Sequence, residues 1–455
     1  MTTNHPRTDN LRAAMTDRGL GIIKFAALAL IVLLSTRQAY AVYALKGLSP
    51  AQVAFVCLGV LGIYWVLSGH RLALGARGLT IAVLVNLLTV VVSYGMATTR
   101  VLPRDAVILA GQGAAAFAVS VGALTGFVFL FAAHPENTAR IIEILLKALV
   151  IGGAVTATFA LVQFVTGIDI AAMARIPGFM RYVDTGVAHG IVREGVVRAQ
   201  GAAGHSLELS AVLTTIAPIG AALIYNAKTA AKKTWPWAAL TAIVIAGSVV
   251  TVSRSAFVGL AAAILVMSWR WPVRRLAGLL GAAVAAAVVA AVSGLGIFEA
   301  IIKTFLGSDN DPSLQSRARG IDYVMSHWTE HFWLGQGSFT YPTGPEQPVL
   351  DNEYLSRLIE GGVVGAAALV ILTITAIVYA GTARNRCNDA AATELINGVL
   401  GALVALAIIS TVLDVSAFQQ ISMIRWVLIV LAGAAWVLVK HNQIPAPPIR
   451  QAVRT

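Results

Sequence analysis

Long apolar runs constrain the fold of this chain more than any other feature of its sequence. Runs of 16 to 28 residues recur from near residue 21 to near residue 439. Such lengths suit helices that cross a hydrocarbon core of roughly 30 Å. Backbone polar groups inside lipid must be satisfied within the segment itself, which favours helices. The runs lack the period-two alternation of a membrane β-barrel. The sequence therefore predicts an all-α polytopic membrane protein.

These runs predict twelve transmembrane helices in one membrane domain, residues 1–455. The predicted ranges are 21–36, 50–69, 78–97, 106–133, 141–166, 206–226, 236–252, 255–270, 275–295, 355–381, 394–413 and 417–439. We expect cytoplasmic tails at residues 1–20 and 441–455, and long extracytoplasmic loops at residues 167–205 and 296–354. The polar start resembles the beginning of a signal peptide, but no convincing cleavage site follows, so the first run is predicted to be retained.

The distribution of charge predicts the orientation of the spans. If the N-terminus is cytoplasmic, the segments on that side hold 19 Lys and Arg against 6 Asp and Glu, whereas the opposite side holds 13 against 15. This asymmetry follows the positive-inside rule. The formal net charge of +12 is explained by topology in this way, so nucleic acid is not expected as a partner.

The spans 236–252 and 255–270 are separated by a very short turn and predict a tight hairpin. Each limb has about 16 residues and would be about 24 Å long at the rise of an α-helix, which is shorter than the bilayer core. The turn Ser253-Arg254-Ser255 should therefore lie within the outer leaflet, where an arginine requires an anionic partner. Ser255 is expected to cap the second limb and leave amide groups pointing outward.

The loop 296–354 contains a predicted amphipathic helix that lies on the outer membrane surface. Asp311-Pro312 is a typical helix start. Apolar side chains then follow at helical spacing, namely Ile321, Met325, Trp328 and Phe332. Arg317 falls on this apolar stripe and Arg319 on the opposite, wet face. Because a charge on the buried side requires a partner, Arg317 is the stronger candidate for ligand binding.

Arginines at the outer interface predict a phosphate-containing ligand. An arginine keeps its charge when desolvated and offers paired donors to phosphate. Arg198, Arg254 and Arg317 therefore suit a lipid-linked diphosphate. In the alternative interpretation these arginines are solvated or paired with outer acids. For Arg425, within the last span, a pair with Asp414 is favoured over contact with the substrate.

The segment Asp351-Asn352-Glu353-Tyr354 precedes a span and has two interpretations. It is either a polar helix cap or the source of a catalytic base. Asp351 is the first candidate for the base and Glu353 the second. The sequence contains no typical metal-binding motif, and we predict neither a metal site nor a cofactor.

Together these segments resemble the O-antigen ligase/polymerase (Wzy-type) family of membrane glycosyltransferases. The resemblance extends from about Arg198 to Gly365. Its motifs are RAQGAAGHSLEL, SRSAFVGL, SRARGIDYV, FWLGQGSF and DNEYLSRLIEGGVVG. It implies a multi-pass protein of the bacterial inner membrane, with both termini cytoplasmic, that transfers a glycan without a metal from an undecaprenyl diphosphate carrier to an extracytoplasmic acceptor.

The resemblance also implies roles for individual residues. Arg198, Arg254 and Arg317 would contact the carrier diphosphate, with Arg319 as an alternative to Arg317. Residues in a supporting role would be His205, Glu208, Ser253, Ser255, Asn352 and Tyr354. The expected partners are the lipid-linked glycan, an acceptor glycan and membrane lipids, with other polysaccharide-assembly proteins as further candidates.

One departure from the family pattern affects the predicted reaction. Ligases of this family usually carry His-Asn where this chain has Asp351-Asn352. The departure favours polymerisation of a surface polysaccharide over transfer to a lipid or protein acceptor. Two alternatives of other classes are a transporter of lipid-linked oligosaccharide or polysaccharide and a non-catalytic assembly subunit. Broken helices with polar groups at mid-span would favour the transporter.

Overall fold

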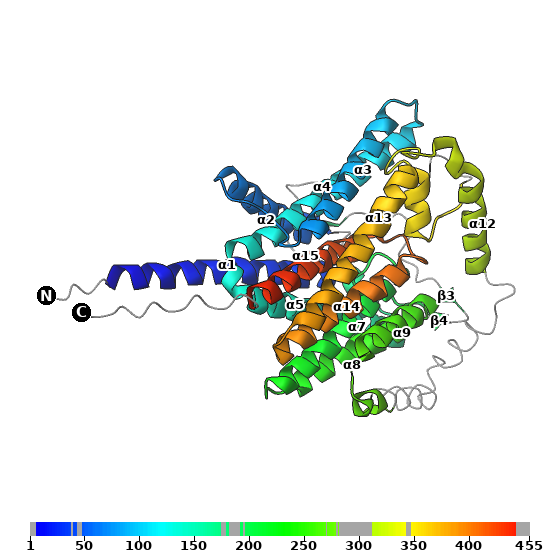
Figure 1. Cartoon of the computed structure of the whole chain (residues 1–455). Helices are drawn as coiled ribbons and strands as arrows, with labels where there is room; N and C mark the ends of the chain where they lie inside the picture. The colour runs from blue at the N-terminus through cyan, green and yellow to red at the C-terminus, as the bar shows by residue number, and fades with distance from the viewer. Residues whose placement is uncertain are drawn as a thin grey trace, which may run out of the picture.

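The computed structural model is a bundle of long helices (Figure 1). The structure describes residues 6–37, 40–42, 48–173, 179–181, 192–193, 196–269, 271–278, 281, 312–342 and 347–442. The long helices are α1 (Pro6–Ser35), α2 (Pro50–Leu67), α3 (Arg77–Thr98), α4 (Arg104–Ala133), α5 (Thr138–Thr166), α7 (Ser206–Thr229), α8 (Trp235–Val249), α9 (Arg254–Ser268), α12 (Pro312–His327), α13 (Glu353–Arg386), α14 (Ala390–Ile409) and α15 (Gln419–Asn442).

Short elements connect the long helices. The helical ones are η1 (Pro135–Asn137), α6 (Ile170–Met173), η2 (Trp328–His331) and η3 (Val415–Ala417). The strands are β1 (Tyr40–Val42), β2 (Phe179–Arg181), β3 (Val192–Arg193) and β4 (Val196–Val197). β1 pairs with β2 and β3 with β4, both antiparallel, with Ala41 opposite Met180 in the first pair.

The described part of the chain contains eight helices that are long and apolar enough to cross a membrane. Three shorter apolar helices accompany them, namely Gly19–Ser35 within α1, α8 and α9. The chain is therefore a multi-pass, all-helical membrane protein, as predicted. Helices cover eleven of the twelve predicted ranges, and the range 275–295 lies mostly outside the described residues. Helix α1 begins at Pro6, before the first predicted range, so most of the segment predicted as the N-terminal tail is helical.

Local sequence signals fix where several helices begin. At α2, the Ser49 side chain accepts from the Gln52 amide while the Gln52 side chain accepts from the Ser49 amide, and Pro50 occupies the first helical position. This reciprocal capping satisfies amides that the first turn leaves unpaired. Asn352 caps α13 and Asp389 caps α14, each through a side-chain oxygen that accepts from two amides of the first turn.

Small residues allow close helix packing in the bundle. A Cβ added at Gly59 of α2 would lie 2.8 Å from the Gly122 backbone of α4, and one added at Gly126 would lie 2.5 Å from the Leu58 Cβ. Membrane helices lack a hydrophobic drive toward one another, so contacts of this kind supply much of their attraction. Large apolar side chains such as Leu84 and Leu88 of α3 are exposed instead, as expected for a lipid-facing surface.

The two ends of the bundle differ in structure. Helix α1 begins and α15 ends at one end, whereas α12 lies across the opposite end, where α9 and α13 begin (Figure 1). Gly320 and Val324 of α12 are buried, and Val324 packs with Leu350 and Ile359. Ile321 and Met325 remain exposed. A helix is therefore present where the sequence predicted one, but Trp328 and Phe332 of the predicted stripe lie beyond its end. We call the end of the bundle that carries α12 the headpiece end.

A break in α13 fixes the position of the segment 332–337 at the headpiece end. Gly362 has φ 62° and ψ −168°, a conformation that is essentially restricted to glycine. The segment 332–337 docks at this break. The Val363 amide donates to the Phe332 carbonyl at 2.9 Å, and the Gln336 amide donates to the Ile359 carbonyl at 2.9 Å. Arg100 braces the same segment through the Gln336 carbonyl at 2.9 Å. The FWLGQG and EGGVVG motifs therefore form one interlocked unit.

Candidate active site at the headpiece end

Arg198 lies against the hairpin formed by α8 and α9. Its side chain is 7% exposed, and its Nε donates to the Thr251 carbonyl at 3.0 Å. Thr251 lies in the turn between the two helices, three residues before Arg254. Residues 53 positions apart in the chain are thus brought together, which supports the predicted grouping of these two arginines.

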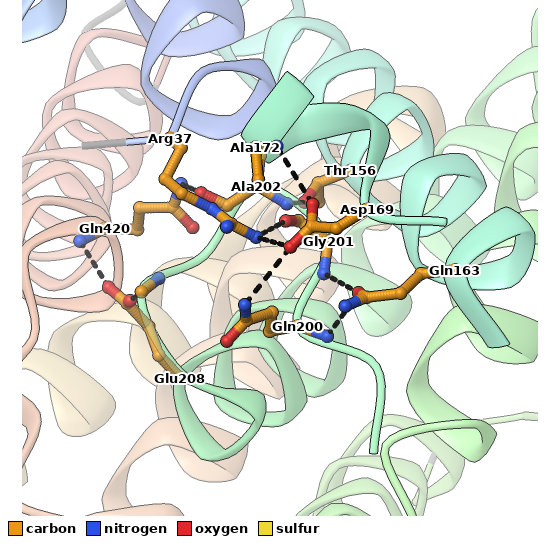
Figure 2. Close-up of polar contacts among 11 residues, drawn as sticks. Arg37, Thr156, Gln163, Asp169, Ala172, Gln200, Gly201, Ala202, Glu208 and Gln420 are labelled. Atoms are coloured by element: carbon orange, nitrogen blue, oxygen red, sulfur yellow. Dashed lines mark hydrogen bonds and ion pairs between the residues drawn. The ribbon is translucent and has the colours of Figure 1, made fainter. Parts of the chain in front are cut away.

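A buried polar network fixes the segment that carries Arg198 (Figure 2). Arg37 donates to the Asp169 carboxylate at 2.7 Å and to the Gly201 carbonyl at 2.8 Å. Gln163 accepts from the amides of Gln200 and Gly201 at 2.9 and 3.2 Å. Irregular backbone inside a membrane bundle is stable only when its polar groups are satisfied. The network meets this requirement and holds the segment in one conformation.

Glu208 and His205 complete the anchoring of this segment. Glu208 is 2% exposed and accepts from the Gly204 amide at 2.9 Å and from the Gln420 amide at 2.8 Å. His205 caps α7, because its Nδ1 accepts from the Leu207 amide at 3.1 Å. Burial, together with the nearby positive charge of Arg198, lowers the pKa of His205. Both predicted supporting residues therefore position backbone around Arg198.

Arg254 and Arg317 approach the site from two further elements. Arg254 is the half-buried first residue of α9. A Cβ added one turn later, at Gly259, would lie 3.1 Å from Ile409 at the end of α14. Arg317 of α12 is also half-buried, and it donates to the Val412 carbonyl at 3.5 Å, just beyond that same end of α14. Both arginines therefore lie near the end of α14 at Ile409.

Arg317 and Arg319 differ in exposure, although Arg317 shares its face with Gly320 and Val324 and not with the predicted stripe of Ile321 and Met325. Arg317 is half-buried on the side of α12 that faces the protein, whereas Arg319 is exposed. The remaining hairpin residues differ from the expectation. Ser253, not Ser255, occupies the cap position of α9, and it makes no side-chain capping bond. The two hydroxyls instead pair with each other at 2.7 Å, because α9 begins one residue earlier than predicted.

Asp351 lies beside Arg317, immediately before α13. Its side chain is half-buried. Burial raises the pKa of Asp351, and the positive charge of Arg317 offsets part of that rise. A carboxylate with a raised pKa is a better proton acceptor than an ordinary exposed one. Asn352, the next residue, acts as the helix cap, with its Oδ1 accepting from the amides of Tyr354 and Leu355 at 3.0 and 3.1 Å.

Glu353 is held in a buried ion pair. It is 2% exposed, and its carboxylate accepts from Arg425, from the Ser410 hydroxyl at 3.0 Å and from the Ser416 hydroxyl at 2.6 Å. Arg425 thus pairs with Glu353 and not with Asp414, which was the alternative expected from the sequence. Tyr354 extends the same junction by donating to the Ala407 carbonyl at 3.2 Å. These contacts join α13 to α14, η3 and α15.

A polar cavity of about 300 Å³ lies beside the start of α13 and is lined in part by Glu353 and Ser416. Aromatic, amide and charged side chains line it, including Gln112, Phe339, Tyr341, Arg357, Glu360 and Asp414. Burial, reinforced by the negative charge of Glu353, raises the pKa of Asp414 to about 6. An adjoining cavity of about 160 Å³ shares Phe339 and Arg357 and extends to Asn86. Asn86 is 2% exposed, and no residue that the structure describes donates a hydrogen bond to its buried Oδ1.

Sequence reasoning missed this cavity and the network around Arg37. One signal was available. Arg357 and Glu360 lie in the first two turns of a predicted span, where charged side chains are costly and are usually paired or functional. The partners Asn86, Gln112 and Asp414 come from distant parts of the chain. No local pattern connects them.

Comparison with known protein families identifies part of this region. Residues 237–370 match the family model described as O-antigen ligase. The match spans the α8–α9 hairpin, α12 and the first part of α13, and so includes Arg254, Arg317 and Asp351. It confirms the family resemblance for the motifs from SRSAFVGL onward, whereas the motif RAQGAAGHSLEL lies before the matched residues. No protein of curated function matches the chain.

Proposed function

We propose that this protein transfers a glycan from a polyprenyl diphosphate carrier to a sugar hydroxyl on the extracytoplasmic side, since residues 237–370 match the family model described as O-antigen ligase. The observation that carries the proposal is the grouping of Arg254, Arg317 and Asp351 at the headpiece end. A cluster of arginines beside a carboxylate of raised pKa suits the departure of a diphosphate and the activation of a hydroxyl.

In this proposal Arg198, Arg254 and Arg317 bind the carrier diphosphate. Guanidinium groups neutralise the charge that develops on a leaving diphosphate, and they require no reorganisation when they are already fixed. Arg198 is fixed by Thr251 and by the network around Arg37. Arg319 is not assigned a role, since its side chain is exposed. This arrangement supports a metal-independent reaction, because the chain itself supplies the positive charge.

Asp351 is the proposed general base. The acceptor oxygen attacks the anomeric carbon of the donor sugar, and its proton passes to the Asp351 carboxylate. The bond between that carbon and the diphosphate oxygen breaks, and the diphosphate keeps the electron pair. Glu353, the second candidate, is fully engaged with Arg425, Ser410 and Ser416. We therefore assign Glu353 a positioning role.

The polar cavity beside α13 is the proposed site for the acceptor sugar. Phe339 and Tyr341 supply aromatic surface, and Gln112, Glu360 and Asp414 supply hydrogen-bonding groups. Pockets that bind small ligands usually combine apolar surface with a few polar groups that fix orientation. The cavity is lined by Glu353, Ser356 and Arg357 in the first turns of α13. Asp351 comes two residues before Glu353, so we propose that donor and acceptor meet at Asp351.

We propose polymerisation of a surface polysaccharide as the reaction, since an aspartate stands where the related ligases carry a histidine. The second candidate is transfer of a finished glycan to a lipid or protein acceptor, which the description of the matched family favours. A strain that lacks the protein distinguishes the two. Single repeat units on the carrier indicate a polymerase, whereas complete polymer that stays on the carrier indicates a ligase.

Reconstitution tests whether the protein is an enzyme. Purified protein in liposomes is given the lipid-linked repeat unit, and both products are measured. We expect longer glycan together with free polyprenyl diphosphate. Movement of an unchanged lipid-linked glycan across the membrane would instead identify a transporter, and absence of both would indicate a non-catalytic subunit.

A further inference from the structure

Another cavity lies at the end of the bundle opposite the headpiece end. It has a volume of about 420 Å³. It is enclosed by the connection between α2 and α3, by α4, by the start of α5 and by the end of α15. Most of its walls are apolar, with Leu74, Val128, Phe131, Val430, Ala434 and Val437 among the lining residues. This is the end where α1 begins and α15 ends (Figure 1).

The wall between the α2–α3 connection and α15 is closely packed. Gly75 has φ +73°, and a Cβ there would overlap the Val437 side chain. A Cβ added at Gly433 would lie 2.6 Å from the Leu74 carbonyl oxygen. These contacts seat residues 74–75 directly on α15. The cavity is therefore formed by packed backbone and does not depend on one movable side chain.

The charged residues that line the cavity are all positive. Arg71 and Lys440 both line it, and no aspartate or glutamate does. Glu136, next to the lining residue Pro135, has its carboxylate 3.9 Å from the His134 Nδ1. Two cations next to apolar walls suit a ligand with an anionic headgroup and a hydrocarbon tail. Basic pockets between membrane helices on the cytoplasmic side bind such headgroups.

We propose that this cavity binds one anionic phospholipid, with its phosphate between Arg71 and Lys440 and one acyl chain against α4 and α15. The positive-inside orientation puts this end at the cytoplasmic leaflet, whose anionic lipids attract such cations. The lipid would cover apolar surface on α4, α15 and the α2–α3 connection together. The site therefore links three elements at the end remote from the headpiece. This proposal is independent of the glycan-transfer reaction.

Lipid-dependent stabilisation of the delipidated full-length protein tests the proposal. Thermal unfolding and native mass spectrometry are compared in phosphatidylglycerol and in phosphatidylcholine of the same chain lengths. We expect phosphatidylglycerol to raise the unfolding temperature and to leave one bound lipid. The double variant Arg71→Gln/Lys440→Gln should bind phosphatidylglycerol roughly 30-fold more weakly, because each cation near the membrane surface contributes to anion binding.

A charge-matched variant provides the control. Lys228→Gln/Lys232→Gln removes two exposed cations outside the cavity and should keep the selectivity for phosphatidylglycerol. Both variants should unfold like the wild type in phosphatidylcholine, which shows that they fold. Equal stabilisation by the two lipids, equal loss in the control, or full stabilisation by inorganic phosphate alone would each overturn the proposal.

Discussion

At the scale of single residues, the carboxylates at the start of α13 have different environments despite their closeness in sequence. Asp351 is half-buried and has Arg317 as its charged neighbour. Glu353 is 2% exposed and engaged by Arg425 and two serines. A general base must be able to release and accept a proton during turnover. The difference in environment assigns that role to Asp351 and a positioning role to Glu353.

Replacing Asp351 tests its role as the base. Asp351→Asn should lower the turnover number by about 10² to 10⁴, which is the usual contribution of general base catalysis. Because burial raises the pKa of Asp351, the wild-type rate should fall on acidification at a pH above the ordinary range for aspartate. The pH profile of transfer by reconstituted protein measures this limb. Asp351→Glu should retain the limb, and an unchanged limb in Asp351→Asn would exclude the assignment.

The buried ion pair between Glu353 and Arg425 is expected to stabilise the folded protein. Arg425→Met leaves an uncompensated carboxylate in the interior, so we expect a loss of about 3 to 5 kcal/mol in the free energy of unfolding. The double variant Arg425→Met/Glu353→Gln should lose less than the sum of the single variants, since no charge remains unpaired. Denaturation of purified protein in detergent measures both values.

A more exposed ion pair serves as the control for this measurement. Glu143 and Lys147 approach to 2.6 Å on α5, with side chains that are 24% and 33% exposed. Replacement of Lys147 by Met should cost only about 0 to 1 kcal/mol. If Arg425→Met were no more costly than Lys147→Met, the Glu353 pair would not hold the start of α13 in place.

At the scale of elements, the break in α13 and the segment 332–337 depend on each other. A Cβ at Gly362 would overlap the Trp333 backbone, and a Cβ at Gly335 would overlap the Glu360 carbonyl. The Ser93 hydroxyl of α3 also donates to that carbonyl, at 2.7 Å. Further along the chain, the Tyr341 amide donates to the Glu360 side chain at 3.1 Å. This bond attaches to α13 the part of the chain that precedes Asp351. Close backbone contacts therefore connect the segment 332–337 to the bundle.

Gly362→Ala tests this interlock. The native dihedral angles at Gly362 are costly for any residue with a side chain, by about 1 to 3 kcal/mol, and the overlap with Trp333 adds to that cost. We expect a lower unfolding temperature and lower transfer activity. Gly111→Ala in α4, where an added Cβ meets nothing within 4 Å, should be neutral or slightly stabilising. Equal behaviour of the two variants would show that the break is not required.

At the scale of the whole molecule, the sequence predicted the architecture better than the site. Apolar runs located eleven of the described helices because hydropathy alone determines which segments enter lipid. The short hairpin limbs were also predicted, and α8 and α9 have 15 residues each. Contacts between distant residues could not be predicted. Arg37 and Gly201 are 164 positions apart and Arg425 and Glu353 are 72 apart, and no periodicity encodes either pairing.

The orientation of the bundle provides a prediction at this scale. Single cysteines at exposed Arg319 and Arg274 are introduced after Cys57 and Cys387 are replaced by serine. If α12 lies outside the cytoplasm, an impermeant thiol reagent should label Arg319→Cys in intact cells and Arg274→Cys only after permeabilisation. The opposite labelling pattern would mean that the headpiece faces the cytoplasm.

The central claim is that fixed arginines at the headpiece end stabilise a departing diphosphate. Its most direct test is the turnover of a lipid-linked glycan by reconstituted Arg254→Ala, compared with Arg104→Ala, which removes an exposed arginine at the start of α4. We predict that Arg254→Ala loses at least about 10²-fold in turnover, as is typical when one preorganised donor is removed, while it stays folded in the membrane. Arg104→Ala should turn over like the wild type. Wild-type turnover by Arg254→Ala would contradict the proposed site.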